Sequence, residues 1–460
     1  MTTADINPPN SIRGGRLFIE DCDVAELANQ FGTPLFVVSE TQLVNNVRTY
    51  QQAFDKHWPE GRVRIMAAIK SNPVTAIRRI LTREGCGCDT FGNGELELAL
   101  LGGVPPEDIA LNGSIKSPEI IAKAIDLGIH IVLDSKRELE FCEQEAARLG
   151  KRADVVLRLK PWLEEMDVPS DFFPVRTIRE MTQTVKYGIP NSDLAGMVAR
   201  LAVSENLNLI GAHTHSGRHS KKPEFWQSIA RNFVKMLVEI RAGMGGDWTP
   251  QVVSIGGGFA AKYDKESRVT VTDYKTPDVE AYAAACTGTF RDEMTANSMS
   301  TDGIIFEIEP GRALHNDTGI HIAKVEVVKH ETATINRIWA ETDTSEVFLS
   351  IGSLNLQSPF EYIIANKADQ PATQIADIVG VTCNYECMAE QQPVPELDSG
   401  DVLAFLNTGS YIEPYTCNFN ALPRPGMILV KGSEACWIKR PERQDEVFAR
   451  DLLPDRLQPA

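Results

Sequence analysis

Residues 63–73 read VRIMAAIKSNP, an apolar run from Val63 to Ile69 that ends in a lysine, a short polar pair and a proline. The run is typical of a buried strand that stops at a turn. A lysine at such a point can extend its ammonium into water while its stem covers apolar surface. It can also be a chemical group, because a buried lysine that loses its proton forms a Schiff base with an aldehyde cofactor. The stretch alone leaves both interpretations of Lys70 open.

The strand in residues 63–69 is the first of a series in which strands and helices alternate. Residues 72–85, NPVTAIRRILTREG, have a helical pattern, and the next units read IALNG then SPEIIAKAIDLG, and HIVLDS then KRELEFCEQEAARLG. Further strand ends are DVVLRLKP, LIGAHTHSG and VVSIGGGF. This alternation predicts a parallel sheet. The number of units favours a (β/α)8 barrel of the TIM type over an open sheet.

Polar or glycine residues follow the predicted strands. Barrels of this kind place their chemistry at the carboxyl ends of the strands. One polar residue at a strand end is unremarkable, but a polar or glycine residue on unit after unit predicts a site. These residues are Lys70, Asn112, Asp134, Arg158, His215, Gly256 and Glu309.

After about residue 315 the pattern changes to β-type runs joined by turns, such as TGIHIAKVEVVKHE and GMILVKG. We therefore expect a second, mostly antiparallel β domain at residues 316–460, completed by an N-terminal segment at residues 1–36. The barrel is then expected at residues 37–315. Within it, residues 160–182 are expected to form a long irregular connection, and such loops are usually functional or mobile.

The chain of 460 residues has a formal charge of −17, which argues against a nucleic-acid surface or a polybasic membrane patch. No apolar run has the length of a membrane span, and the polar start MTTADINPPNSIRGG lacks the apolar core of a signal peptide. The nine cysteines include no CxxC pair, so we expect no disulfide framework. These features predict a cytoplasmic protein that binds neither nucleic acid nor membrane.

Two motifs suggest an anion site. SIGGGF, residues 254–259, has three glycines after a strand, which either make a tight turn or let backbone N–H groups approach an anion. EIEPGRAL, residues 307–314, places Glu309 and Arg312 around a Pro-Gly turn. The two side chains either pair with each other, or Arg312 grips a phosphate while Glu309 holds a protonated ring nitrogen.

Two further motifs leave alternatives open. HTHSGRHS, residues 213–220, could bind a metal, have a structural role, or stack an imidazole ring on a cofactor. No carboxylate or cysteine clusters with it at zinc-like spacing, which argues against the metal. CNYEC, residues 383–387, contains either two buried cysteines or one thiol that reaches an active site and moves protons.

In this order, and over about residues 15–440, the motifs resemble the fold-type III amino-acid decarboxylases that depend on pyridoxal phosphate (PLP). This family contains the diaminopimelate and ornithine decarboxylases. AAIKSNP is similar to the family's cofactor-lysine strand, and CDTFGNGELELAL, NGSIKSPEII, VLRLKP and VKYGI are similar to the segments that follow. HTHSG, IGGGF, EPGR and GSYIEPYTCNFN resemble the later motifs. The resemblance implies an alanine racemase-like fold, which is a barrel plus a β domain.

The resemblance also implies roles for residues. Lys70 would bind pyridoxal 5′-phosphate as an imine, His215 would stack on its ring, and Glu309 would hold its ring nitrogen. Cys383 would take part in returning a proton to the α-carbon after CO2 is lost, and would come from the partner subunit of a homodimer with shared sites. The catalytic residues are thus Lys70, His215, Glu309 and Cys383, and the further cofactor-binding residues are Asp89, Arg158, Gly256, Gly257, Gly258, Gly311, Arg312 and Tyr411.

The implied substrate-binding residues are Ser358, Tyr362 and Asn384, and this part of the sequence departs from the family. Diaminopimelate decarboxylases hold the far end of their substrate with an arginine and a glutamate, and ornithine decarboxylases use two aspartates. The matching positions here are Ser358, Ile363 and Asn384, which carry no charge. Arg218 and Ser254 also replace the usual Ser and Asp. The resemblance therefore implies α-decarboxylation of a small-molecule amino acid in an altered distal pocket.

Two alternatives remain open. An amino-acid racemase on the same fold would break the Cα–H bond, but alanine racemases of this fold put an arginine beside the ring nitrogen where this chain has Glu309. A non-catalytic regulatory homologue is the second alternative. The retention of Lys70, Glu309, Arg312 and Cys383 argues against it.

Overall fold

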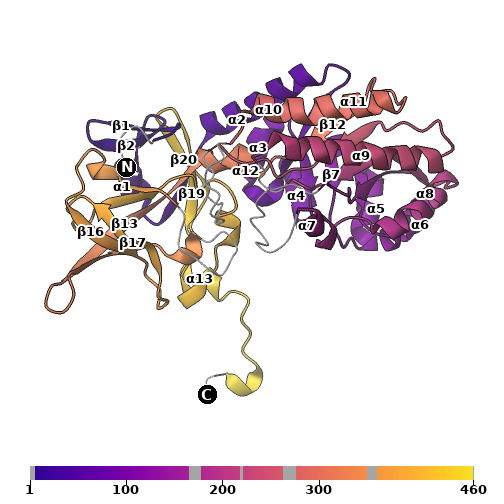
Figure 1. Cartoon of the computed structure of the whole chain (residues 1–460). Coiled ribbons are helices and arrows are strands. Elements are labelled where there is room, and N and C mark those ends of the chain that lie inside the picture. The colour runs from indigo at the N-terminus through magenta and orange to yellow at the C-terminus, as the bar shows by residue number, and fades with distance from the viewer. Residues whose placement is uncertain (1–5, 165–177, 218–220, 263–275, 350–359, 459–460) are drawn as a thin grey trace. The chain divides into compact units, whose positions relative to one another are not determined.

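The computed structural model describes residues 6–164, 178–217, 221–262, 276–349 and 360–458 (Figure 1). The chain divides into two compact units. We call residues 44–315 the barrel unit, and residues 1–43 together with 316–460 the β unit.

The barrel unit contains a closed barrel in which all neighbouring strands are parallel. This confirms the (β/α)8 barrel expected from the alternating pattern. Its interior is filled by one apolar residue from most of the strands, among them Met66, Val132 and Val156. The strands are β5 (Val63–Ala68), β6 (Gly87–Thr90), β7 (Ile109–Leu111), β8 (His130–Leu133), β9 (Ala153–Leu159), β10 (Leu207–Thr214), β11 (Val252–Ser254) and β12 (Ile305–Ile308).

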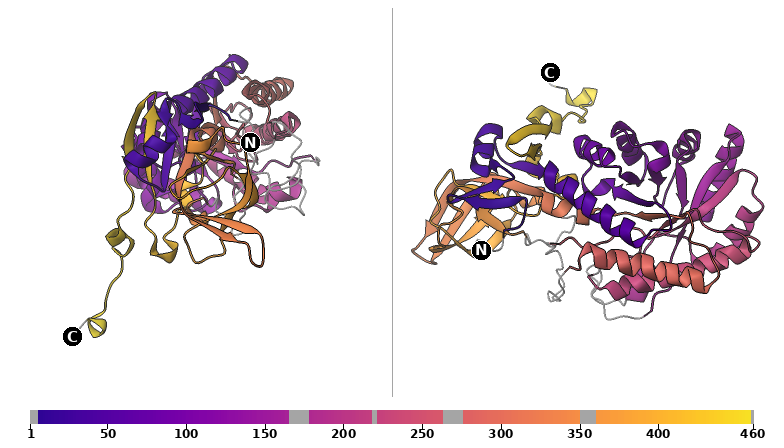
Figure 2. Two further views of the ribbon diagram at one scale, coloured as in Figure 1. Left: turned by 90° about the vertical axis from the view of Figure 1, so that its left-hand side faces the viewer. Right: turned by 90° about the horizontal axis from the view of Figure 1, so that it is seen from above.

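Helices surround these strands, as Figure 2 shows. The expected irregular connection at residues 160–182 ends in a helix, α7, and residues 165–177 lie outside the described part of the chain. The helices are α2 (Glu40–His57), α3 (Thr75–Arg83), α4 (Asn93–Leu101), α5 (Pro118–Leu127), α6 (Lys136–Leu149), α7 (Ile178–Thr184), α8 (Asn191–Ala202), α9 (Pro223–Gly243), α10 (Val279–Ala283), α11 (Thr289–Ala296) and α12 (Arg312–His315).

Local sequence signals explain where helices start and stop beside the strands that carry the site. Pro118 opens α5, where a missing N–H costs nothing, and Gly128 ends it with a left-handed φ of 75°. Ser135 caps α6 by accepting a hydrogen bond from the backbone N–H of Glu138 at 3.3 Å. These caps keep the loops after β7 and β8 short and fixed.

A buried ion pair ties the same two loops together. Lys116 Nζ lies 2.8 Å from Glu138 Oε2, and the same oxygen accepts the backbone N–H of Asp134 at 2.8 Å. Burial lowers the pKa of Lys116 and raises that of Glu138, although each charge opposes the other's shift. A buried pair of this kind is costly to break, because the remaining charge has no partner.

The β unit has a mostly antiparallel sheet in the order β17-β16-β14-β13-β4-β19-β20, and β18 pairs with β13 and β15. Its apolar core includes Val37, Ile322 and Ile428. This confirms the expected second, mostly antiparallel β layer. The elements are β1 (Asn10–Arg13), β2 (Arg16–Ile19), β3 (Cys22–Asp23), α1 (Val24–Phe31), β4 (Leu35–Ser39), β13 (Gly319–Glu331), β14 (Arg337–Thr342), β15 (Tyr362–Ile364), β16 (Gln374–Val379), β17 (Cys387–Val394), β18 (Val402–Phe405), β19 (Gly426–Lys431), β20 (Glu434–Lys439) and α13 (Gln444–Val447).

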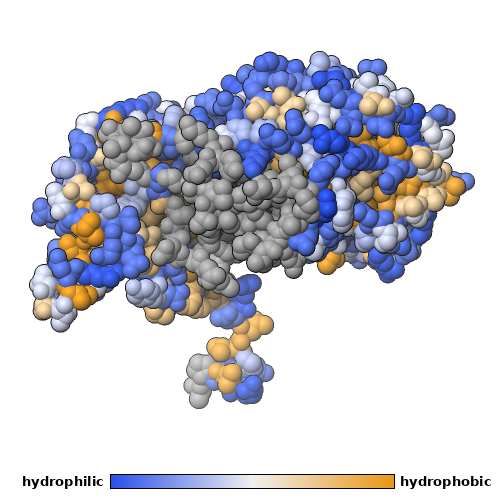
Figure 3. Space-filling view, viewed as in Figure 1, coloured by the Kyte–Doolittle hydropathy of each residue, from blue (hydrophilic) through white to orange (hydrophobic). Residues whose placement is uncertain are grey.

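The surface of the barrel unit is mainly hydrophilic on the face shown in Figure 3. In the described part of the chain, no helix combines the length and apolar character that crossing a membrane requires. Beyond β20, the C-terminal segment exposes Phe448, Leu452, Leu453 and Leu457.

Candidate active site

A lysine and a buried aspartate form an ion pair at the carboxyl ends of β5 and β6. Lys70 lies in a 3₁₀ turn directly after β5, and its Nζ is 2.6 Å from Asp89 Oδ2. Burial opposes ionisation of Asp89, but the charge and hydrogen bond of Lys70 outweigh it and lower the pKa of Asp89 below its usual range. The contact with Asp89 holds the amine in place. The Lys70 side chain is still 39% exposed, so the amine remains accessible.

A second carboxylate, Glu309, follows β12 and is linked to this pair through an amide. Asn112 Nδ2 donates to Asp89 Oδ1 at 2.6 Å and lies 3.4 Å from Glu309 Oε1. Glu309 Oε1 also lies 2.9 Å from His213 Nε2 and accepts a hydrogen bond from Ser254 Oγ at 3.3 Å. All five side chains are buried. Hydrogen bonds therefore run continuously from the lysine amine to Glu309.

Sequence reasoning did not assign His213 or Ser254 to the site, and it noted Asn112 only as a residue at a strand end. The signal that could have found His213 is strand alternation, because residues two apart on a strand share a face. His213 therefore shares the inward face with His215. In the barrel, Ser254 stands opposite His213 in the register of β10 and β11.

The glycine run after β11 is packed so closely that side chains are excluded. A Cβ on Gly256 would lie 2.4 Å from the carbonyl oxygen of Thr214, and one on Gly257 would lie 2.1 Å from the carbonyl oxygen of Glu309. Gly256 and Gly258 also have left-handed φ values of 74° and 89°. The backbone N–H of Glu309 donates to the carbonyl of Gly256 at 2.9 Å, which ties this loop to the end of β12.

Gly257→Ala should lower the thermal stability of the protein and weaken its binding of a phosphate-bearing cofactor. The added methyl would push against a backbone carbonyl that cannot rotate away, which costs about 1–3 kcal/mol. Thermal unfolding and a cofactor titration measure the two effects. Gly196→Ala in α8 is the matched control, because its Cβ would meet no atom within 4 Å and alanine favours a helix. Wild-type stability and cofactor affinity in Gly257→Ala would contradict the packing argument.

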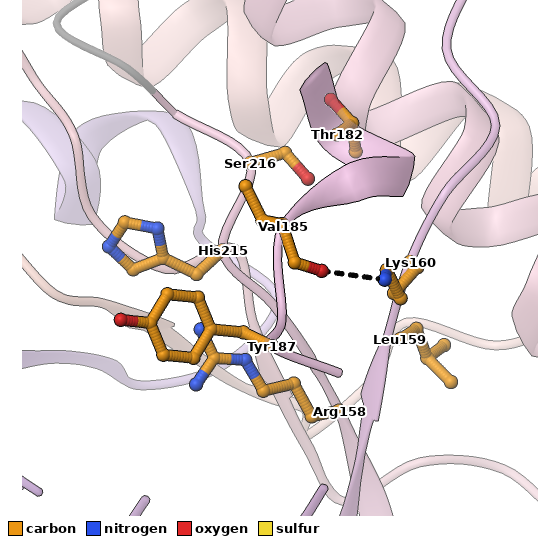
Figure 4. Close-up of a pocket in the computed structure, with 8 residues that line it drawn as sticks. All are labelled: Arg158, Leu159, Lys160, Thr182, Val185, Tyr187, His215 and Ser216. Atoms are coloured by element: carbon orange, nitrogen blue, oxygen red, sulfur yellow. Dashed lines mark hydrogen bonds between the residues drawn. The ribbon is translucent and has the colours of Figure 1, made fainter. Parts of the chain in front are cut away.

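A pocket opens at the carboxyl ends of β9 and β10 (Figure 4). The guanidinium of Arg158 lies under the ring of Tyr187, 5.0 Å from its centroid. Lys160 Nζ donates to the backbone carbonyls of Gln183 and Val185 at 3.0 and 2.9 Å, which holds the segment after α7 against β9. The lining residues are Arg158, Leu159, Lys160, Thr182, Val185, Tyr187, His215 and Ser216.

The barrel unit thus brings most of the predicted cofactor residues to one end of the barrel. Arg312 is buried at the start of α12, three residues beyond Glu309, and Gly311 precedes it. Among the described residues, no group of three or more His, Cys, Asp and Glu side chains could hold a metal ion. The residues at this end are Lys70, Asp89, Arg158, His215, Gly256, Gly257, Gly258, Glu309, Gly311 and Arg312.

The cysteine motif lies in the β unit, in a loop before β17. Cys383 and Asn384 are exposed. The loop is organised by the buried Glu386, whose carboxylate accepts hydrogen bonds from the hydroxyl of Ser345 at 2.7 Å and the backbone N–H of Thr382 at 2.5 Å. The thiol is therefore presented on a structured loop.

The other predicted residues of the β unit are placed separately. Tyr362 begins β15, and burial raises its pKa to about 12. Tyr411 has a φ of 57°, a left-handed conformation that is uncommon for a residue other than glycine. Ser358 lies outside the described residues.

The side chains at the barrel end fit the cofactor expected from the sequence. Lys70 supplies an amine for an aldehyde, Glu309 a carboxylate for a ring nitrogen, and the backbone of Gly256–Gly258 a cradle that a Cβ would fill. Each group follows a different strand, so the closed barrel brings them to one end.

Comparisons with known proteins agree with this chemistry. Residues 40–316 match the family model described as "Pyridoxal-dependent decarboxylase, pyridoxal binding domain". The chain is 29% identical to diaminopimelate decarboxylase of Methanocaldococcus jannaschii over 466 aligned residues, which cover 98% of each chain. It is also 29% identical to diaminopimelate decarboxylase of Pseudomonas fluorescens, over 96% of this chain and 99% of that one.

Solved structures give the same result for the fold. The crystal structure of the diaminopimelate decarboxylase from M. jannaschii superposes with a TM-score of 0.87 at 27% identity, covering 98% of this chain and 99% of that chain. The structure of the same enzyme in complex with L-lysine superposes with a TM-score of 0.86. Both similarities extend over the barrel and the β unit together.

Proposed function

We propose residue roles and a substrate class from one premise: the chain belongs to the family of pyridoxal-dependent decarboxylases, whose domain model matches more than half of it. The protein is a PLP-dependent carboxy-lyase that acts on an amino acid. The observation that carries the proposed roles is the unbroken chain of hydrogen bonds between the amine of Lys70 and the carboxylate of Glu309.

In this proposal Lys70 attaches the cofactor through its amine, and Asp89 orients that amine. Glu309 keeps a proton on the ring nitrogen, and His215 packs against the ring. When bound, PLP supplies an electron sink for the charge left at the α-carbon by departing CO2. The remaining cofactor contacts are assigned to Arg158, Gly256, Gly257, Gly258, Gly311, Arg312 and Tyr411.

We assign the return of the proton at the α-carbon to Cys383, supplied by a second copy of the chain. An exposed thiol on a loop fixed by Glu386 can deliver a proton to a neighbouring molecule. Tyr385 on the same loop is 90% exposed, which suits a surface that a partner covers. The enzyme is then a homodimer with shared sites. The cytoplasmic location expected from the sequence stays a prediction.

Cys383→Ala should retain the yellow colour of bound PLP and lose about a hundredfold in kcat, the lower range for loss of a general acid. Part of the proton delivery should shift from the α-carbon to the cofactor, giving pyridoxamine phosphate and a carbonyl product in place of the amine. Mass spectrometry of the products measures this partition. Cys436→Ala, which removes another exposed thiol of the β unit, in β20, is the control and should behave as wild type. Clean amine product at wild-type rate from Cys383→Ala would remove this thiol from the mechanism.

Mixing two defective variants tests the shared site. Lys70→Ala and Cys383→Ala homodimers are each defective, but a mixed dimer has one site with both residues intact. After unfolding and refolding of an equimolar mixture, activity should return to about one quarter of wild type. No recovery would show that both residues of a site come from one chain.

The substrate class we propose is an amino acid whose side chain has no charge at its far end. The resemblance implies charged residues in the distal pocket, and the matching positions here are the uncharged Ser358, Ile363 and Asn384. In the β unit, Ile363 packs into the apolar core, where it cannot supply a polar contact.

A panel of L- and D-amino acids incubated with the PLP-loaded enzyme tests the reaction and the substrate together. Release of CO2 and an amine is expected from members with uncharged side chains. An inverted amino acid without CO2 would identify a racemase instead.

A further inference from the structure

Among the residues that the structure describes, the side-chain hydrogen bonds of Glu309 all fall on one of its two carboxylate oxygens. Oε1 lies 2.9 Å from His213 Nε2, 3.3 Å from Ser254 Oγ and 3.4 Å from Asn112 Nδ2. His213 makes the shortest of these contacts. Among the described residues, Oε2 has no hydrogen bond of this kind, so it is the oxygen that a ligand can use.

The environment of His213 determines which of its nitrogens carries a proton. Its side chain is 1% exposed, and Nδ1 has no hydrogen-bond partner in the described part of the chain. A proton on Nδ1 would be a buried, unpaired donor, which is costly. A neutral ring protonated on Nε2 satisfies Glu309 Oε1 and leaves the carboxylate its negative charge.

The position of His213 in β10 makes this arrangement rigid. Its register partners are Arg158 in β9 and Ser254 in β11, so its backbone is bonded on both sides. The backbone of Glu309 is fixed as well, by its bond to Gly256 and by the close approach of Gly257. Both ends of the contact are therefore preset before a ligand binds.

We propose that His213 is a positioning residue: its neutral imidazole holds Oε1 of Glu309, so that Oε2 and the negative charge are directed at the pyridine nitrogen of the cofactor. This inference rests on the proposed contact between Glu309 and that nitrogen. It assigns different tasks to the first two histidines of the stretch HTHSGRHS. His213 acts through Glu309, and His215 touches the cofactor.

The test is a double-mutant cycle read out on the cofactor. His213→Leu, Glu309→Gln and the double variant are loaded with PLP carrying ¹⁵N in its ring. The ¹⁵N chemical shift reports whether the ring nitrogen is protonated, and a titration gives the dissociation constant of PLP. His213→Leu should raise that constant about tenfold, as expected for a lost hydrogen bond to a charged group, and should move the shift toward the unprotonated form.

The coupling between the two substitutions distinguishes a positioning role of His213 from a general loss of structure. If His213 acts through Glu309, adding His213→Leu to Glu309→Gln should change the PLP constant less than about twofold. His213→Gln keeps a donor at similar reach and should recover most of the wild-type ¹⁵N shift. If His213→Leu does not fold, His213→Asn gives the same comparison, because its amide is too short to reach Glu309.

The control is His130→Leu in β8, a second buried barrel histidine, whose ring lies 4.0 Å from Glu307. It should leave the ¹⁵N shift at its wild-type value. Additive effects in the cycle would overturn the inference about His213 but not the proposed role of Glu309. A change of the ¹⁵N shift in His130→Leu as large as that in His213→Leu would do the same. A wild-type ¹⁵N shift in Glu309→Gln would overturn the proposed role of Glu309, and the inference with it.

Discussion

Replacing Lys70 by alanine should abolish the yellow colour of the holoenzyme and lower decarboxylation by at least about a thousandfold, the scale expected when a group at the reacting centre is lost. In the proposed function the amine of Lys70 attaches the cofactor, and its position is set by the 2.6 Å contact with Asp89. Absorbance of the PLP-loaded variant and CO2 release measure the two effects.

Chemical labelling makes this expectation specific. Reduction of the wild-type holoenzyme with borohydride, followed by peptide mapping, should place the cofactor on Lys70. Lys151→Ala removes an exposed lysine that pairs with Asp126 on the surface, and it should keep both colour and rate. A label on Lys160 or Lys116, or a coloured Lys70→Ala variant, would show that the attachment residue is wrong.

The barrel could be predicted from the sequence because its signal is local and repeated. Most strands are short apolar runs, helices such as α5 and α6 follow with a 3.6-residue pattern, and Gly128 and Gly150 mark where those two helices end. The helix at Ile178–Thr184 was missed, because residues 160–182 were expected to form an irregular connection.

The hydrogen bonds that His213 and Asn112 make with Glu309 could not be predicted in the same way. His213 meets Glu309 across 96 positions of sequence, and Asn112 meets it across 197. Such contacts depend on the order in which strands close the barrel and on their register. The sequence places each residue at a strand end, but only the closed barrel shows which side chains share one carboxylate oxygen.

The acidic residues that could replace the missing distal charges are already engaged where the structure describes them. Glu386 is bonded within its own loop, and Glu413 forms an ion pair with Lys439. Glu164 accepts a hydrogen bond from Asn232 in α9 at 2.9 Å. Glu165, Asp167 and Asp171 lie outside the described residues. At Glu386 and Glu164 a distal ammonium would have to compete with these partners.

Meso-diaminopimelate and L-ornithine should therefore be poor substrates, with kcat/KM at least about a hundredfold below that of the best amino acid with an uncharged side chain. A distal charge buried without a partner costs several kcal/mol, and each 1.4 kcal/mol is about tenfold in kcat/KM. Steady-state kinetics on diaminopimelate, ornithine, lysine and neutral amino acids measure the difference. A kcat/KM of about 10⁴ M⁻¹s⁻¹ or more for diaminopimelate or ornithine would show that the pocket holds a charge after all.

Restoring the family's charges should reverse this preference. The Ser358→Arg, Asn384→Glu double variant supplies the arginine and the acidic residue that diaminopimelate decarboxylases carry, and its kcat/KM for diaminopimelate should rise at least about tenfold. Gln392→Glu adds an acidic residue on the exposed face of β17 and serves as the control for charge alone. It should leave the substrate preference unchanged, because a solvated charge away from the loop of Cys383 gives the far end of the substrate no partner.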